Sequence, residues 1–95
     1  MTELVNVPWP GLARRSPLPD DFTGGIKNAV GDIAYFKNGE WHREDGPARI
    51  YYANPTDPAV YAWQLNGDEY TFDEWCKRTK LTPEEILLLR ITYGV

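Results

Sequence analysis

The chain has 95 residues, of which 42% are hydrophobic and 25% are charged, and its net charge is −4. These values are typical of one small globular domain, and without a basic stripe we expect no direct nucleic-acid partner. The single cysteine, Cys76, excludes an intramolecular disulfide and a multi-thiolate zinc site. With no apolar run of about 18 residues and no signal-peptide core, we expect no membrane contact and a cytoplasmic location.

Residues 1–30 are predicted to form an extended, proline-rich arm packed on the domain. Pro8, Pro10, Pro17 and Pro19 disfavour helix and central strand, while interspersed apolar side chains such as Trp9 supply contacts. The arm is expected to cover a face or an edge of a sheet; partner capture is the functional alternative.

Residues 31–71 are predicted to form an antiparallel β-meander of two hairpin units. Each unit carries an Asn-Gly pair, Asn38-Gly39 and Asn66-Gly67, typical of type I′ hairpin turns. The units repeat at an offset of 28 residues (38 to 66), and Tyr35 of the first aligns with Trp63 of the second. The expected strands cover residues 32–37, 40–42, 48–53, 59–65 and 68–70.

Residues 72–95 are predicted to form two capping helices, over about 72–79 and 83–93. Thr71 and Thr82 each precede a glutamate by three positions, which is the capping-box pattern. The second helix is apolar over most of its circumference, more than one buried stripe requires. We expect it to be sandwiched between the sheet and the arm; the alternative is that one flank, including Leu88 and Tyr93, is a contact surface for a partner or a homodimer.

The two hairpin units also carry a family resemblance. The blocks concerned are YFKNGEWHREDGPARIYY and YAWQLNGDEYTFDEWCKRT, in residues 35–52 and 61–79. They resemble small phage and bacterial proteins with an NG-x-x-HR-x-DGPA repeat, grouped with the MORN-variant repeats of YwqK-type antitoxin components. The resemblance covers about residues 31–80 and implies a repeat fold and a phage-like context. The second unit departs from it, with Tyr70-Thr71-Phe72 where His-Arg would fall.

The segment His42–Pro47 holds the only histidine of the chain beside three charged residues, and chemistry there must be weighed against structure. A metal site lacks ligands, because one histidine and one cysteine are too few even with Glu44 and Asp45. Nucleophilic catalysis lacks a partner, because Ser16 lies in the arm and Cys76 on a buried helix face. No metal, cofactor or catalytic residue is therefore expected.

A structural corner between two strands is the favoured interpretation of this segment. Asp45 is expected to accept backbone N–H groups, Gly46 to adopt a positive φ, and Pro47 to fix entry into the next strand. A ring nitrogen of His42 is expected to bond a loop carbonyl or the Asp45 carboxylate. Arg43 is expected to pair with Glu44, Asp45 or an acid across the sheet.

Core packing is the default expectation for each of the aromatic strand residues, and a surface that binds protein is the alternative. Strand alternation cannot place all of them in one core, so some must lie on the second sheet face. The residues predicted to contact a partner are Trp9, Trp41, His42, Arg43, Tyr51, Trp63, Leu88 and Tyr93.

The chain is thus predicted to be an α+β domain that acts without catalysis, by binding protein. From the resemblance, we expect a phage-encoded accessory protein that binds and modulates or inhibits a host protein of defence or transcription. An antitoxin or immunity partner of a toxin is the first alternative, and a small metal-dependent hydrolase or nuclease using His42 is the second.

Overall fold

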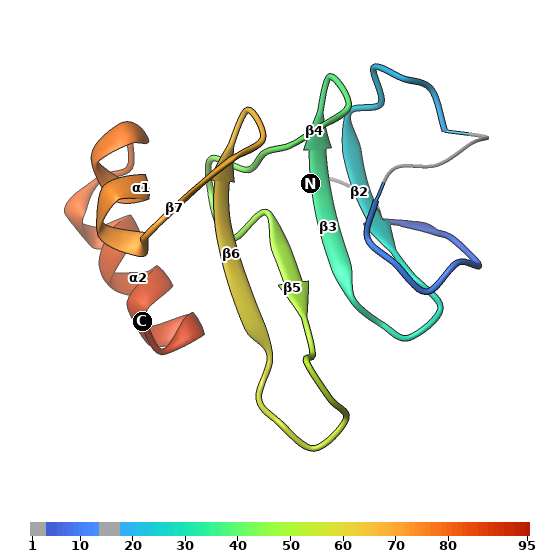
Figure 1. Ribbon diagram of the computed structural model, residues 1–95. Helices are drawn as coiled ribbons and strands as arrows, with labels where there is room; N and C mark the ends of the chain where they lie inside the picture. The colour runs from blue at the N-terminus through green and yellow to red at the C-terminus, as the bar shows by residue number, and fades with distance from the viewer. Residues whose placement is uncertain (1–3, 14–17) are drawn as a thin grey trace.

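The computed structural model of the chain describes residues 4–13 and 18–95, and it confirms the α+β class (Figure 1). A mixed sheet of seven strands is followed by two C-terminal helices. The strands are β1 (Leu4–Asn6), β2 (Gly24–Lys27), β3 (Ile33–Lys37), β4 (Glu40–Trp41), β5 (Arg49–Tyr51), β6 (Val60–Leu65) and β7 (Asp68–Tyr70). The helices are α1 (Phe72–Arg78) and α2 (Pro83–Tyr93).

The sheet extends beyond the predicted meander, because the arm contributes two strands. The strand order is β1-β2-β3-β5-β6-β7, with β4 paired to the end of β3. All pairs are antiparallel except β1 with β2, which are parallel. The expectation that the arm holds no central strand is wrong for β2, which lies between β1 and β3. No proline occurs between Pro19 and Pro47, so this stretch can donate every ladder hydrogen bond.

Both Asn-Gly pairs form the predicted type I′ turns. The φ angles are 51° at Asn38 and 82° at Gly39, and 52° at Asn66 and 86° at Gly67. The first turn joins β3 to β4 and the second joins β6 to β7. The backbone of the two units is therefore repeated closely, as the 28-residue offset predicts.

The N-terminal part of the chain covers one face of the sheet and forms the first core. Val7, Ile26, Ala34 and Phe36 are buried together there. Around them pack the half-buried side chains of Trp9, Leu12, Leu18, Phe22 and Trp41. The predicted packing of the arm on the domain is thus seen for its described part.

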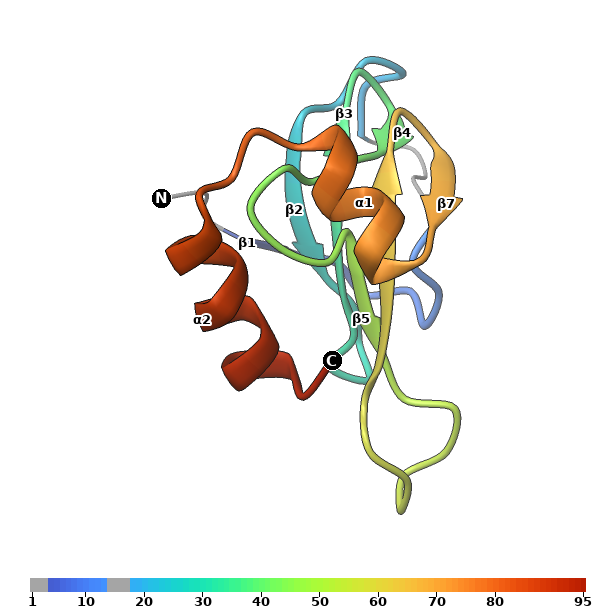
Figure 2. The same cartoon turned by 90° about the vertical axis from the view of Figure 1, so that its left-hand side faces the viewer.

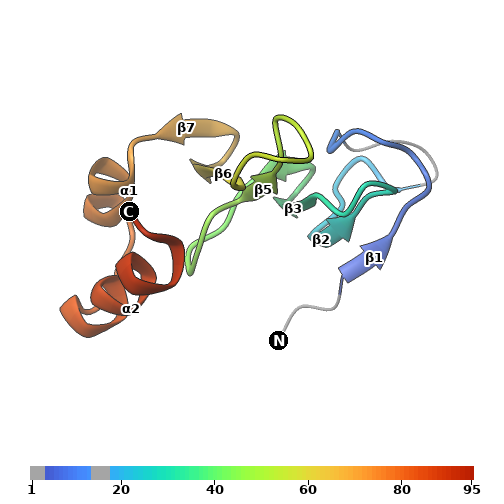
Figure 3. The ribbon, with the colours of Figure 1, turned by 90° about the horizontal axis from the view of Figure 1, so that it is seen from below.

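The helices cover the opposite face at the other end of the sheet (Figures 2 and 3). Trp63 of β6 contacts the rings of Phe72 and Trp75 on α1 and Tyr93 on α2, with centroids 4.6, 4.8 and 5.7 Å away. Trp75 is completely buried. The aromatic residues therefore serve two faces, as the strand alternation predicts.

Caps fix the limits of both helices. Thr71 and Thr82 accept hydrogen bonds from the N–H groups of Glu74 and Glu85, and Thr82 and Glu85 complete the reciprocal capping box. Gly94 closes α2 in the left-handed conformation at φ 69°. The predicted sandwiching of α2 between sheet and arm is wrong: β1 and β2 lie at the far edge of the sheet, and α2 has no buried residue.

Candidate functional site

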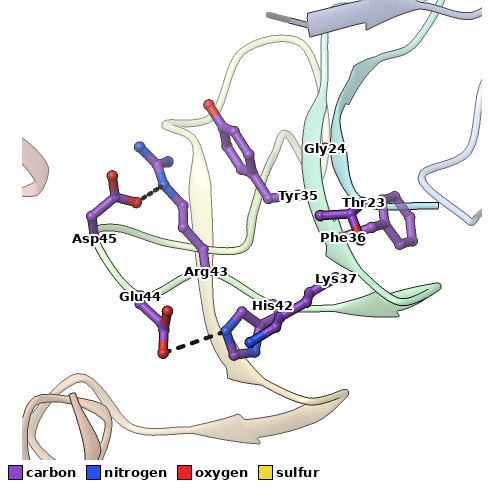
Figure 4. Close-up of a pocket in the computed structure, with 9 residues that line it drawn as sticks. All are labelled: Thr23, Gly24, Tyr35, Phe36, Lys37, His42, Arg43, Glu44 and Asp45. Carbon is purple, nitrogen blue, oxygen red and sulfur yellow. Dashed lines mark hydrogen bonds and ion pairs between the residues drawn. The ribbon is translucent and has the colours of Figure 1, made fainter. Parts of the chain in front are cut away.

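His42 connects the two hairpin units. Its side chain is only 9% exposed, and its Nδ1 accepts a 2.9 Å hydrogen bond from the backbone N–H of Asn66 in the second turn. A neutral imidazole that accepts at Nδ1 carries its proton on Nε2. That atom faces the exposed carboxylate of Glu44 at 3.8 Å (Figure 4). The partner of His42 is thus the neighbouring repeat, and the expected bond to its own loop or to Asp45 is wrong.

Arg43 holds the loop that follows. Its guanidinium lies 4.2 Å from the centroid of the Tyr35 ring, its Nε donates to Asp45 Oδ1 at 2.9 Å, and its Nη1 donates to the Pro47 carbonyl at 3.3 Å. Figure 4 shows the Arg43 side chain between Asp45 and the Tyr35 ring. The backbone carbonyl of Arg43 accepts from the indole N–H of Trp75 at 3.0 Å. The loop is therefore tied to α1 as well as to the sheet.

The requirement for glycine at Gly46 has a different cause from the one predicted. Gly46 is not among the residues with positive φ. Instead, a Cβ at this position would lie 2.7 Å from Cζ and 2.9 Å from Nε of Arg43. A side chain at this position would displace the guanidinium from Asp45 and from the Pro47 carbonyl, and this favours glycine. Asp45 likewise binds the Arg43 side chain rather than a backbone N–H of an Asx turn.

A hollow of about 570 Å³ lies beside this loop. Its lining includes Tyr35, Lys37 and the four residues His42–Asp45, with Thr23 and Gly24 at the far side (Figure 4). Cys76 does not line it, and Ser16, the only serine of the chain, lies outside the described residues. Among residues 4–13 and 18–95, no group of three or more His, Cys, Asp or Glu side chains could hold a metal ion. His42 Nε2 is buried and has no hydrogen-bond partner among the described residues, and in the neutral ring it carries the proton, so it offers no lone pair to a metal or a substrate proton.

Several residues predicted to contact a partner are used inside the fold. Trp63 is buried under the helices, and Trp9 packs against the first core. The indole N–H of Trp41 donates to the Leu12 carbonyl at 3.4 Å. Arg49 lies over the rings of Trp41 and Tyr51, 4.2 and 5.5 Å from their centroids. These side chains stabilise the sheet and its two covers.

Two further predicted contact residues lie on α2, on opposite sides of the helix. Tyr93 faces inward, with its ring 4.9 Å from Tyr61 and 5.7 Å from Trp63. Leu88 faces outward and is 62% exposed, and Leu87 and Ile91 beside it are 56% and 71% exposed. We call Leu87, Leu88 and Ile91 the outer face of α2. The sequence indicated a second apolar flank but did not assign Leu87 and Ile91 to it.

Cys76 of α1 is half-buried rather than a core residue. Burial raises the pKa of its thiol, the nearby Arg90 lowers it, and Asp73 adds to the rise. A thiol of raised pKa is a poor nucleophile at neutral pH. Cys76 also does not line the hollow beside His42.

No family model, curated protein or solved structure matches the chain. Nor is any helix within residues 4–13 and 18–95 long and apolar enough to cross a membrane.

Proposed function

We propose that this chain is a non-enzymatic protein-binding module whose docking site is the outer face of α2. The observation that carries the proposal is the exposure of Leu87, Leu88 and Ile91 on a helix with no buried residue. Single exposed apolar side chains are common, but neighbouring ones on a helix face are typical of interaction sites. A complementary groove would gain about 1–2 kcal/mol for each of these side chains that it buries.

The helix is fixed well enough to present this face. Arg90 donates to Asp73 at 2.9 Å and lies 4.9 Å from the Phe72 ring centroid, so it joins α2 to α1. Tyr93 packs on the sheet from the inner side. Ile91 follows Leu88 by three positions and Leu87 by four, which is the spacing of the anchor residues in helix-in-groove recognition.

The resemblance to phage and bacterial repeat proteins supports a host-cell protein as the partner. A component of defence or transcription, modulated or inhibited by the bound module in the cytoplasm, is the partner class that we propose. The antitoxin or immunity role is the same binding event with a toxin as partner. The hydrolase alternative has no supporting contact, because His42 Nδ1 is already bonded to Asn66.

The test is capture from a bacterial lysate followed by binding of the identified protein to purified variants. Leu88→Lys should abolish specific binding while melting as wild type does. Val30→Lys is the matched control, because Val30 is equally exposed, at 64%, on a loop far from α2 in the sequence. Equal binding by both variants would contradict the proposal. Concentration-dependent dimerisation that Leu88→Lys abolishes would assign the face to a second copy instead.

A further inference from the structure

Each hairpin turn in this chain docks on the segment that precedes it, and the docking is the same both times. The N–H of Gly67 donates to the Trp41 carbonyl at 2.8 Å, and the N–H of Gly39 donates to the Phe22 carbonyl at 2.9 Å. In both cases the N–H of the turn glycine donates to the carbonyl of the first residue in a three-residue segment of the preceding unit, and this segment accepts the turn. We call this acceptor the junction triplet.

The second position of the triplet supplies a side-chain acceptor. His42 Nδ1 accepts from the Asn66 N–H at 2.9 Å, and Thr23 Oγ1 accepts from the Asn38 N–H at 3.0 Å. The third position pairs with the residue two before the turn asparagine: the Arg43 N–H donates to Gln64, and Gly24 pairs with Phe36. The two triplets are residues 22–24 and 41–43. Residues 22–24 of the arm therefore make the same kind of junction as residues 41–43 do, although their side chains differ.

A third triplet, residues 69–71, follows the second turn in the same register. The pair Leu65↔Asp68 closes the hairpin, so the next pair, Gln64↔Glu69, leaves the backbone N–H and C=O of Glu69 directed away from β6. Tyr70 turns back to Trp63, and the N–H of Thr71 is again directed outward. The strand order ends at β7, and within the described residues no strand pairs with this edge.

We propose that this open triplet on β7 is a docking site for a β-hairpin of another protein that carries an Asn-Gly type I′ turn and basic flanking residues. The turn would place its glycine N–H on the Glu69 carbonyl and its strand on the Thr71 N–H, as the two internal junctions do. This is strand addition at a free sheet edge, in which the docked turn would fix the register of the added strand. It is independent of the outer face of α2.

Exposed acidic side chains at this edge favour a basic hairpin. Asp68 and Glu69 are exposed on β7, and Glu69 has one partner, Arg49, at 3.5 Å. At the equivalent internal junction, the Glu40 carboxylate lies over the docked turn, 2.9 Å from where a Cβ on Gly67 would be. Asp68 occupies the place of Glu40, so it would face the incoming turn. A second copy of this chain would bring its own acidic pair there, whereas a basic hairpin is attracted.

The second position has diverged in a way that can be reversed. Tyr70 stands where His42 stands in the first unit, and its ring lies under Arg78, with the guanidinium 4.6 Å from the centroid. A phenol hydroxyl lies farther from the backbone than an imidazole Nδ1 does. Tyr70→His should therefore restore the missing acceptor and tighten hairpin binding roughly 2- to 10-fold. Tyr70→Phe is its control.

The test titrates isotope-labelled full-length protein with a peptide of residues 61–70 carrying Asp68→Lys and Glu69→Lys. Amide shifts should be confined to the region of Glu69 and Thr71. A peptide that also carries Asn66→Ala and Gly67→Ala, and so lacks the turn, should bind at least 5-fold more weakly. Thr71→Pro in the protein should weaken binding to the same extent relative to Thr71→Ala. Both variants lose the side-chain cap of α1, but only proline also removes the outward N–H at position 71. The φ angle of −65° at Thr71 already suits proline.

Three results would overturn the proposal. They are shifts that map to α2 or to the hollow beside His42, equal binding by Thr71→Pro and Thr71→Ala, and equal binding by the peptides with and without the turn. Self-association through the same amides without peptide would assign the edge to a second copy and would also overturn it. Equal binding by the paired variants or by the paired peptides would leave the proposed role of α2 unaffected, because neither comparison changes that helix.

Discussion

Replacing His42 by alanine tests whether this residue joins the two repeat units. The substitution removes the 2.9 Å bond to the Asn66 N–H, about 1 kcal/mol, and the packing of a ring that is 9% exposed, about 1–2 kcal/mol more. The expected loss of about 2–3 kcal/mol lowers the melting temperature by about 8–24 °C in a domain of this size. Thermal and urea unfolding, followed by circular dichroism, give both values.

Two variants separate the hydrogen bond from the rest of the ring. His42→Gln keeps a side-chain acceptor and should lose less than His42→Ala. Thr23→Ala removes the equivalent bond to the Asn38 N–H at an exposed residue, so it should cost only about 0.5–1 kcal/mol. A His42→Ala protein that melts with wild type but has lost binding or turnover would refute the structural role.

Three further predictions concern the junction and the helices. Gly67→Ala places a Cβ at φ 86° and 2.9 Å from Glu40 Oε2, so it should cost about 1–2 kcal/mol of unfolding free energy. The cost should exceed that of Gly31→Ala, where φ is 90° but no atom lies within 4 Å of the added Cβ, and equal urea midpoints would show that the contact with Glu40 contributes nothing. Trp75→Phe keeps an aromatic ring but leaves the Arg43 carbonyl without its 3.0 Å donor, and should cost about 1–3 kcal/mol by urea unfolding; a loss below that range would mean that water replaces the indole. Burial raises the pKa of the Cys76 thiol, so iodoacetamide should alkylate the folded protein more slowly than the urea-unfolded chain at mildly alkaline pH, and equal alkylation rates would contradict the shift. Because the folded state holds the thiol proton more tightly, the contribution of Cys76 to stability is present below the thiol pKa of the unfolded chain and is lost as the pH rises through the thiol pKa of the folded protein.

Local patterns predicted most of the fold. The Asn-Gly pairs defined both hairpins, and the threonine caps defined both helices, because each depends on a backbone conformation that few residues adopt. Strand β2 was missed, since its four residues were assigned to a proline-rich segment although none of them is proline. Its pairing with β3 is a long-range contact that no local pattern signals.

The contacts of the candidate site were less predictable than its structural role. His42 bonds Asn66, a residue 24 positions away, and Gly46 accommodates a side chain rather than a positive φ. Both contacts depend on how the units stack, which requires the register between them. The exposed flank of α2 was indicated by its apolar circumference, but which residues faced outward depended on where Tyr93 docked.

The hydrogen bond at His42 can be observed directly, because the chain has one histidine and therefore one set of ring nitrogen signals. Nitrogen-15 NMR of the imidazole in folded protein at neutral pH should show a proton on Nε2, none on Nδ1, and a scalar coupling between Nδ1 and the Asn66 amide. A ring protonated on Nδ1, or an Asn66 amide that exchanges freely with solvent, would contradict the assignment of this motif as the junction between repeats.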